Sequence, residues 1–185
     1  MNERRARTRG RGGFSLVELV VVLVILSLMA TLVAVNWQAI LPKTELHSAV
    51  RELAAGLSTA RSEAISRNQS YHVQYDVDAS RWRLVTPFRA GGSLALVEEE
   101  RLALPWKVLP GSVRIKQVSV DGVEHSKGVV WVRFDPIGTG TSHTVHLEQP
   151  VTESVFTIET QGLLGLVDYR EGAWTRPAPR EDDFR

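Results

Sequence analysis

The chain has 185 residues, a formal net charge of +1, 43% hydrophobic residues, 23% charged residues and no cysteine. This length is enough for one ordinary domain, or for one domain with an appendage. The balanced composition excludes both a fully disordered polyelectrolyte and a polytopic membrane protein. The lack of cysteine excludes disulfides, iron–sulfur clusters, cysteine-ligated zinc and a thiol nucleophile.

The first 35 residues combine a basic leader with an apolar run. Residues 1–13 contain five arginines and one glutamate, so this leader carries +4 and the rest of the chain carries −3. Residues 14–35 contain one charged side chain, Glu18. As a helix this run is about 33 Å long, close to the hydrocarbon thickness of a bilayer. We therefore predict a single transmembrane helix over residues 14–35, with a cytoplasmic N-terminus set by the arginines.

Three kinds of N-terminal segment have this layout: a cleaved secretory signal, a plain signal anchor and a prepilin-type leader. The apolar run is longer than a secretory signal requires, and no small-x-small cleavage site follows it, which argues against the first. Glu18 helps to distinguish the other two kinds of segment, the plain signal anchor and the prepilin-type leader. A carboxylate within hydrocarbon costs several kcal/mol and calls for a partner, whereas one at the interface of an ordinary anchor needs none.

The string GFSLVE, from Gly13 to Glu18, closely resembles the type IV prepilin signature. The resemblance implies that a prepilin peptidase cuts between Gly13 and Phe14 and then methylates the new amine of Phe14. It also implies that Glu18 pairs with the N-terminal amine of a neighbouring subunit in a filament. These roles suit the residue types, because glycine lets the backbone lie extended in a cleft and a buried carboxylate needs such a partner.

Residues 36–68 are predicted to continue as a helix into a head. Trp37 is suited to the membrane interface, and Pro42 is predicted to kink or interrupt the helix. From Thr44 to Asn68, apolar side chains recur every three or four residues, and Asn68 is a suitable terminator. The predicted buried stripe consists of Leu46, Val50, Leu53, Leu57, Ala60 and Ala64.

Beyond the helix the pattern changes to short strands separated by glycines and prolines. The predicted fold class is α+β: a pilin-like lollipop with a long N-terminal helix packed on an antiparallel β-sandwich or two-sheet head, residues 69–172. Residues 173–185 are predicted to be a disordered tail. The predicted strands are 71–75, 81–86, 93–97, 112–120, 128–134, 144–147, 154–160 and 163–169.

The predicted helix ends with the phrase LSTARSEAISRN, residues 57–68, and leads into the first predicted hairpin. Together they resemble the GspH/FimT family of minor pilin-like proteins. The family's F-x-P-x-G turn resembles Phe134–Gly138, and its closing strand pair resembles Ile158–Val167. The closing pair departs from the family pattern at Gln161 and at Leu163, where a basic residue is usual. The residues that match the family's helix-end phrase are Leu57, Ala60, Arg61, Glu63, Ala64, Ile65, Arg67 and Asn68.

The resemblance implies a structural role. The protein would be a minor pseudopilin of a type II secretion system, a subunit near the tip of a periplasmic pseudopilus anchored in the inner membrane. The alternative is a minor pilin that primes assembly of a type IV pilus or contributes to DNA uptake. The implied partners are other pseudopilins or pilins, the prepilin peptidase/methyltransferase and an inner-membrane assembly platform. The head would be periplasmic.

Residue patterns argue against catalysis and against a metal or cofactor. His143 and His146 have an odd spacing, which places them on opposite faces of the expected strand. Asp76, Asp78 and Ser80 begin like a calcium loop, but the later glycine and glutamate of such a loop are missing. The chain also lacks a G-x-S-x-G nucleophile motif. We predict no enzyme activity.

Nucleic acid is likewise not a predicted partner. The chain after the leader is formally −3, and its arginines are interspersed with acidic residues. Residues 98–100 are three consecutive glutamates, which would repel phosphate.

Overall fold

A computed structural model describes residues 15–174, without the side chains of residues 32–41. The chain divides into two compact units, 1–39 and 40–185, which are described separately below. The predicted leader, Phe14 and residues 175–185 lie outside the described residues.

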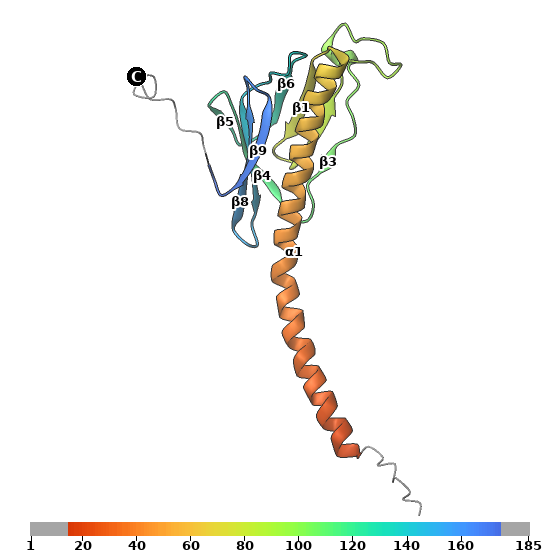
Figure 1. Cartoon of the computed structure of the whole chain (residues 1–185), viewed down its shortest axis with the longest axis vertical. Helices are drawn as coiled ribbons and strands as arrows, with labels where there is room; N and C mark the ends of the chain where they lie inside the picture. The colour runs from red at the N-terminus through yellow and green to blue at the C-terminus, as the bar shows by residue number, and fades with distance from the viewer. Residues whose placement is uncertain (1–14, 175–185) are drawn as a thin grey trace, which may run out of the picture. The chain divides into compact units, whose positions relative to one another are not determined.

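One long helix, α1 (Leu16–Arg67), belongs to both units (Figure 1). At its start, the Ser15 hydroxyl accepts a hydrogen bond from the Glu18 amide at 3.2 Å, as the cap of a new helix does. Pro42 lies inside α1, so of the two predicted outcomes, a kink or an interruption, the interruption does not occur. Proline removes a single backbone donor from a helix of 52 residues, and the apolar stripe that follows it holds the next turns against the head.

The end of α1 is fixed at Asn68, as predicted. Asn68 has a φ of +50°, and its amide donates to the Ile65 carbonyl at 3.3 Å. The Gln69 amide donates to the Ala64 carbonyl at 3.2 Å. These two bonds form a Schellman motif, in which asparagine tolerates the left-handed conformation better than most residues.

The first sheet has four antiparallel strands in the order β3-β2-β1-β6. In chain order these strands are β1 (Tyr71–Asp76), β2 (Arg81–Val85), β3 (Lys107–Val108) and β6 (Val129–Phe134). The inner face carries the buried side chains Val73, Tyr75, Trp82, Val130, Val132 and Phe134.

The second sheet has five antiparallel strands in the order β5-β4-β7-β8-β9. The strands are β4 (Arg114–Val120), β5 (Val123–His125), β7 (His143–Gln149), β8 (Ser154–Gln161) and β9 (Leu166–Glu171). Its inner face supplies the buried residues Val118, Val145, Leu147, Phe156 and Ile158 to the same core. The outer face of this sheet carries the alternate, mostly polar residues.

The core confirms the predicted α+β class and the packing of a helix on two antiparallel sheets. All six residues of the predicted helical stripe are at most 1% exposed and join the inner faces of both sheets in one cluster. Side chains that repeat every three or four residues form one face of a helix, so this stripe was predictable from spacing alone.

The segment between β2 and β3 differs from the prediction. Residues 93–97 are not a strand; Leu94 makes an isolated bridge with Phe88, and a short 3₁₀ turn, η1 (Glu98–Glu100), follows. The short strands β3 and β5 were not predicted. At the chain's end, Ala173 and Trp174 are described, and the rest of the predicted tail lies outside the described residues.

Candidate functional site

The first candidate site is the start of α1, where Glu18 is described and Gly13 and Phe14 are not. Ser15 and Glu18 have the S-x-x-E spacing of a capping box, and the Glu18 amide donates to the Ser15 hydroxyl. Glu18 is exposed on the first turn. A role in capping and a role as a charge partner are therefore both open to this carboxylate.

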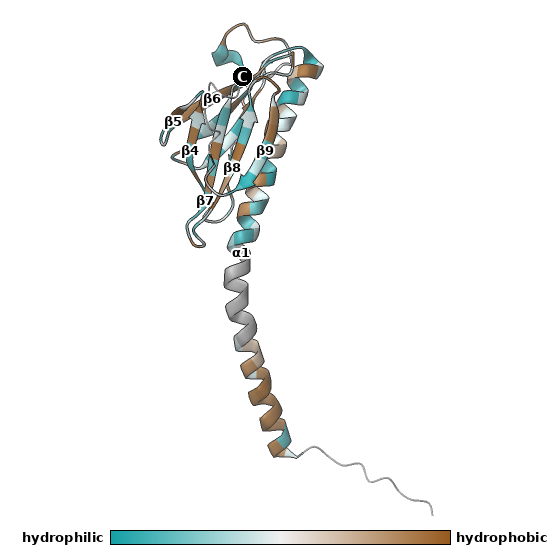
Figure 2. Cartoon of the chain, turned by 60° about the vertical axis from the view of Figure 1, so that its left-hand side comes forward, coloured by the Kyte–Doolittle hydropathy of each residue, from teal (hydrophilic) through white to brown (hydrophobic). Residues whose placement is uncertain are grey.

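The helix surface after Glu18 is apolar (Figure 2). Twelve large hydrophobic side chains between Leu16 and Met29 are 43–79% exposed. The hydroxyls of Ser27 and Thr31 donate to the carbonyls of Leu23 and Ser27, at 2.7 and 2.9 Å. Because each hydroxyl is bonded within its own helix, this surface can be buried without leaving these two donors unpaired.

Over the part of the chain that the structure describes, no helical stretch is both long enough and apolar enough to cross a membrane. The predicted span, residues 14–35, is only partly covered, since Phe14 and the side chains of residues 32–35 are not described.

The second candidate site is the family-like phrase at the end of α1, in which the Arg61 side chain contacts two loops. Its Nε donates to the Gly138 carbonyl at 2.9 Å. Gly138 and Gly165 both have positive φ, +87° and +60°. A Cβ at Gly165 would overlap the Gly138 carbonyl and lie 2.6 Å from Arg61 Nε. The predicted F-x-P-x-G turn and the β8–β9 turn thus meet around one guanidinium, and the motif is explained by packing.

Glu63, also in this phrase, contacts two residues at the end of the helix and the start of β1. Its carboxylate is 3.3 Å from Arg67 Nε and accepts a long hydrogen bond of 3.5 Å from the Tyr71 hydroxyl. Partial burial and the Glu63 charge raise the pKa of Tyr71. These contacts tie the last turn of α1 to the start of β1.

The two sheets are linked by a buried polar contact between Tyr75 and His143. The Tyr75 hydroxyl is 3.1 Å from His143 Nε2, and His143 Nδ1 is 2.8 Å from the Thr141 carbonyl. A carbonyl only accepts, so Nδ1 carries the proton and Nε2 accepts from the tyrosine. Burial lowers the pKa of His143 to about 4, although the Thr141 carbonyl and Asp121 act in the opposite direction. The imidazole is therefore neutral at physiological pH.

The histidines and aspartates considered as metal ligands have structural partners instead. His143 faces the core, and His146 lies on the opposite face of β7, as their spacing predicts. Asp76 accepts from the Ala79 amide and pairs with Arg81, and Asp78 accepts from the Gly128 amide. Among residues 15–174, no group of three or more potential ligands is close enough to hold a metal ion.

Burial would raise the pKa of Asp76, but the Ala79 amide and the Arg81 guanidinium outweigh it and hold that pKa below its usual range. Asp76 is thus a charged turn residue.

Several contacts had no signal in the sequence. Gly56 receives the ring of Trp82, and Gln149, which is fully buried, donates to the Pro42 carbonyl at 3.4 Å. The Ser112 hydroxyl donates to the side-chain oxygen of Gln149 at 2.6 Å. Each joins residues at least 26 positions apart, so no local pattern could reveal them.

A helix packed on two antiparallel sheets, preceded by an exposed apolar stretch of the same helix with a carboxylate in its first turn, defines a pilin-like protein. The prokaryotic N-terminal methylation motif matches residues 8–34. The family of the type II transport protein GspH matches residues 49–162, which is more than half of the chain. The chain belongs to this family.

Solved structures with a similar fold include two from type II secretion. The minor pseudopilin EpsH of Vibrio cholerae is 15% identical, with 72% of this chain and 99% of that chain covered and a TM-score of 0.52. E. coli GspH is 14% identical, with 72% and 93% covered and a TM-score of 0.51. The type IV minor pilin FimU of Pseudomonas aeruginosa is 22% identical, with 69% and 90% covered and a TM-score of 0.49. No curated protein matches the chain by sequence.

Proposed function

We propose that the protein is a minor pseudopilin, a structural subunit near the tip of the pseudopilus of a type II protein secretion system. The family match supports secretion over piliation, because the matched family is that of a type II transport protein. The single observation that carries the structural role is the exposed apolar surface of α1 from Leu16 to Met29. Such a surface is too large for a monomer in water and requires a lipid or protein partner.

The subunit would begin as a single-pass inner-membrane precursor with its N-terminus in the cytoplasm and its head in the periplasm. A prepilin peptidase/methyltransferase would cut after Gly13 and methylate Phe14. Within the filament, Glu18 would pair with the N-terminal amine of a neighbouring pseudopilin, above the inner-membrane assembly platform. The match to the methylation motif over residues 8–34 supports these steps.

Gly13→Leu tests the leader. A bulky side chain beside the scissile bond prevents the close approach of the backbone to the peptidase cleft, so we expect only unprocessed precursor. Intact mass measurement of the purified chain gives the readout, since processing removes 13 residues. Gly12→Leu is the matched control, because the neighbouring glycine is not at the scissile bond and this variant should be cut after Gly13. Normal cleavage of Gly13→Leu would disprove the assignment of the leader.

Glu18→Gln tests the charge pairing separately from helix capping. Glutamine at this position of a capping box can accept the same backbone hydrogen bond as glutamate, but it carries no charge. We expect normal cleavage and at least a tenfold loss of the subunit from sheared or purified filaments, because the new amine of Phe14 then has no counter-charge. Glu99→Ala, which removes an exposed carboxylate from the head, should leave recovery unchanged. If Glu18→Gln is incorporated as fully as the parent, Glu18 has no role in charge pairing and only caps the helix.

The same filament preparation shows whether the subunit belongs to a type II secretion system or to a type IV pilus. Co-purification with other pseudopilins and the secretion platform is the expected result. Co-purification with pilus subunits instead would replace this proposal with the minor-pilin alternative.

A further inference from the structure

A cavity of about 330 Å³ opens on the outer face of the four-stranded sheet, beside the edge strand β6. Its volume lies within the range of about 300–1,000 Å³ that small-molecule sites occupy. Strand β1, the turn η1, strand β6 and the connection from β6 to β7 all contribute to its walls. The lining residues are His72, Glu98, Trp131, Val132, Arg133 and Thr141.

Trp131 presents an indole that the chain itself does not cover. The side chain is 45% exposed. Its ring is nearly perpendicular to the His72 imidazole, at 76° with centroids 6.2 Å apart, so the two rings are not stacked. The structure describes three other tryptophan side chains, and each has a cation of the chain 4.2–5.0 Å from a ring centre. Within the described residues, no such cation lies over Trp131, so this ring is available to a ligand.

The charged groups around the cavity compensate one another. Arg133 Nε lies 3.0 Å from the Asp135 carboxylate, and Arg101 Nη1 lies 3.8 Å from the Glu98 carboxylate. Arg101 also donates to His72 Nδ1 at 2.9 Å. Burial and the Arg101 charge lower the pKa of His72, so the imidazole is neutral at physiological pH. The cavity thus has neither a surplus cation for a phosphate nor a surplus carboxylate for an amine.

Uncharged hydrogen-bonding groups border the same ring. The Thr141 hydroxyl accepts from the Arg133 amide at 3.0 Å, which leaves its hydrogen for another acceptor. The Thr141 amide donates to the Arg133 carbonyl at 2.8 Å, so the backbone groups of Arg133 point away from β1. Because this direction alternates along a strand, the N–H and C=O of Trp131 also point to the open edge of the sheet.

These features select an uncharged ligand that has one flat apolar face and hydroxyls around its rim. A pyranose ring with equatorial hydroxyls is such a ligand, because its axial positions carry only hydrogens. An indole suits the apolar face, since it offers a large apolar surface in polar surroundings. An apolar peptide would instead leave the polar groups around the cavity without partners.

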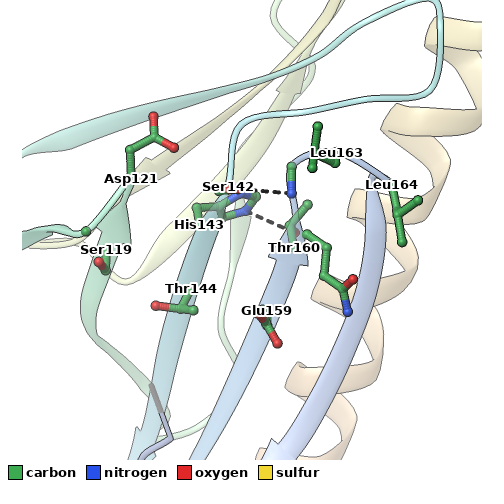
Figure 3. Close-up of a pocket in the computed structure, with 12 residues that line it drawn as sticks. Ser119, Asp121, Ser142, His143, Thr144, Glu159, Thr160, Leu163 and Leu164 are labelled. Atoms are coloured by element: carbon green, nitrogen blue, oxygen red, sulfur yellow. Dashed lines mark hydrogen bonds between the residues drawn. The ribbon is translucent and has the colours of Figure 1, made fainter. Parts of the chain in front are cut away.

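We propose that this cavity binds a pyranose unit of a neutral, β-1,4-linked glycan. The sugar ring stacks on Trp131, and its hydroxyls bond to Glu98, Thr141 and the free edge of β6. The cavity on the outer face of the five-stranded sheet has a different character (Figure 3). Its described lining contains the carboxylates of Asp121 and Glu159, but no lysine, arginine or tryptophan. That cavity therefore provides a control on the same head.

Saturation-transfer NMR on the purified full chain, in a detergent without a sugar head group, tests the proposal. The probes are chitohexaose and cellohexaose, which are both neutral and β-1,4-linked, but only the first carries acetamido groups. We expect saturable transfer to one or both probes, and a loss of at least fivefold in Trp131→Ala. Ser119→Ala, in the cavity of Figure 3, should leave the transfer unchanged. Transfer to chitohexaose alone would assign the site to an acetamido glycan, and transfer to both would assign it to the shared glucan backbone.

Two further measurements keep the result decisive. Trp131→Phe retains a smaller aromatic face, so its transfer should lie between those of the parent and Trp131→Ala, even if the alanine variant folds poorly. Raising the salt concentration should not weaken the transfer, because the ligand is neutral. No saturable transfer to either probe, or full transfer in Trp131→Ala, would overturn the proposal. Stronger, salt-sensitive transfer to an anionic hyaluronan hexasaccharide would overturn it too, by showing an anion site. These measurements need neither leader cleavage nor filament assembly, so they are independent of the proposed function.

Discussion

Replacing Gly56 with alanine should destabilise the head by about 2 kcal/mol, although alanine is the better helix former. In an exposed helix this change stabilises by about 1 kcal/mol. At Gly56 an added Cβ would overlap the ring of Trp82, with Cζ3 at 2.6 Å. Trp82 is 3% exposed, with Lys107 Nζ 5.0 Å from its ring centre, so the ring has little room to retreat. Overpacking of this kind costs about 1–3 kcal/mol or more and outweighs the gain in helix propensity.

Denaturant unfolding of the full chain in detergent, followed by tryptophan fluorescence, measures the effect. Ser58→Ala, at an exposed position of the same helix, is the matched control and should change the unfolding free energy by no more than about 0.5 kcal/mol. Adding Trp82→Phe to Gly56→Ala should recover part of the loss, because a smaller ring leaves space for the methyl group. A gain in stability in Gly56→Ala would mean that the Trp82 ring moves aside and that the higher helix propensity of alanine dominates.

The parts of the fold that could be predicted are those set by local periodicity. The stripe from Leu46 to Ala64 repeats at helical spacing, and every member is buried as expected. The helix end at Asn68 was predictable because it depends only on the backbone conformation of Asn68 and on the nearby carbonyls of Ile65 and Ala64. The failures occur where tertiary context dominates. Helix α1 continues through Pro42, where an interruption was one of the two predicted outcomes. Residues 93–97 have a strand-like composition, but they have no neighbouring strand to pair with beyond one bridge.

The same distinction applies to the candidate sites. Gly13, Phe14 and Glu18 lie within six positions, so their pattern can be read in the sequence without the fold. Arg61 could be matched to a family phrase, but its role required the carbonyl of Gly138, 77 positions away. His143 was considered as a metal ligand because its spacing to His146 is visible, whereas its contact with Tyr75 across 68 positions is not.

The burial of His143 makes the stability of the head depend on pH. The folded chain holds the pKa of His143 at about 4, whereas the unfolded chain has the ordinary value near 6.5. As the pH falls below 6.5, the His143 imidazole becomes protonated in the unfolded state but stays neutral in the folded state. The stabilisation from the neutral imidazole is therefore complete above pH 6.5 and is lost progressively towards pH 4, by about 3 kcal/mol.

Comparing two variants with the parent chain separates this titration from the hydrogen bond. Tyr75→Phe keeps the buried imidazole, so it should lose about 1 kcal/mol at neutral pH and keep the parent's pH dependence. The double variant Tyr75→Phe/His143→Phe removes both polar groups, and its unfolding free energy should fall by about 3 kcal/mol less than the parent's between pH 6.5 and pH 4. His72 and His146, whose pKa values burial also lowers, are common to all three chains and cancel in the difference. Equal pH dependence in the parent and the double variant would therefore show that the contact between the sheets tolerates a charged imidazole.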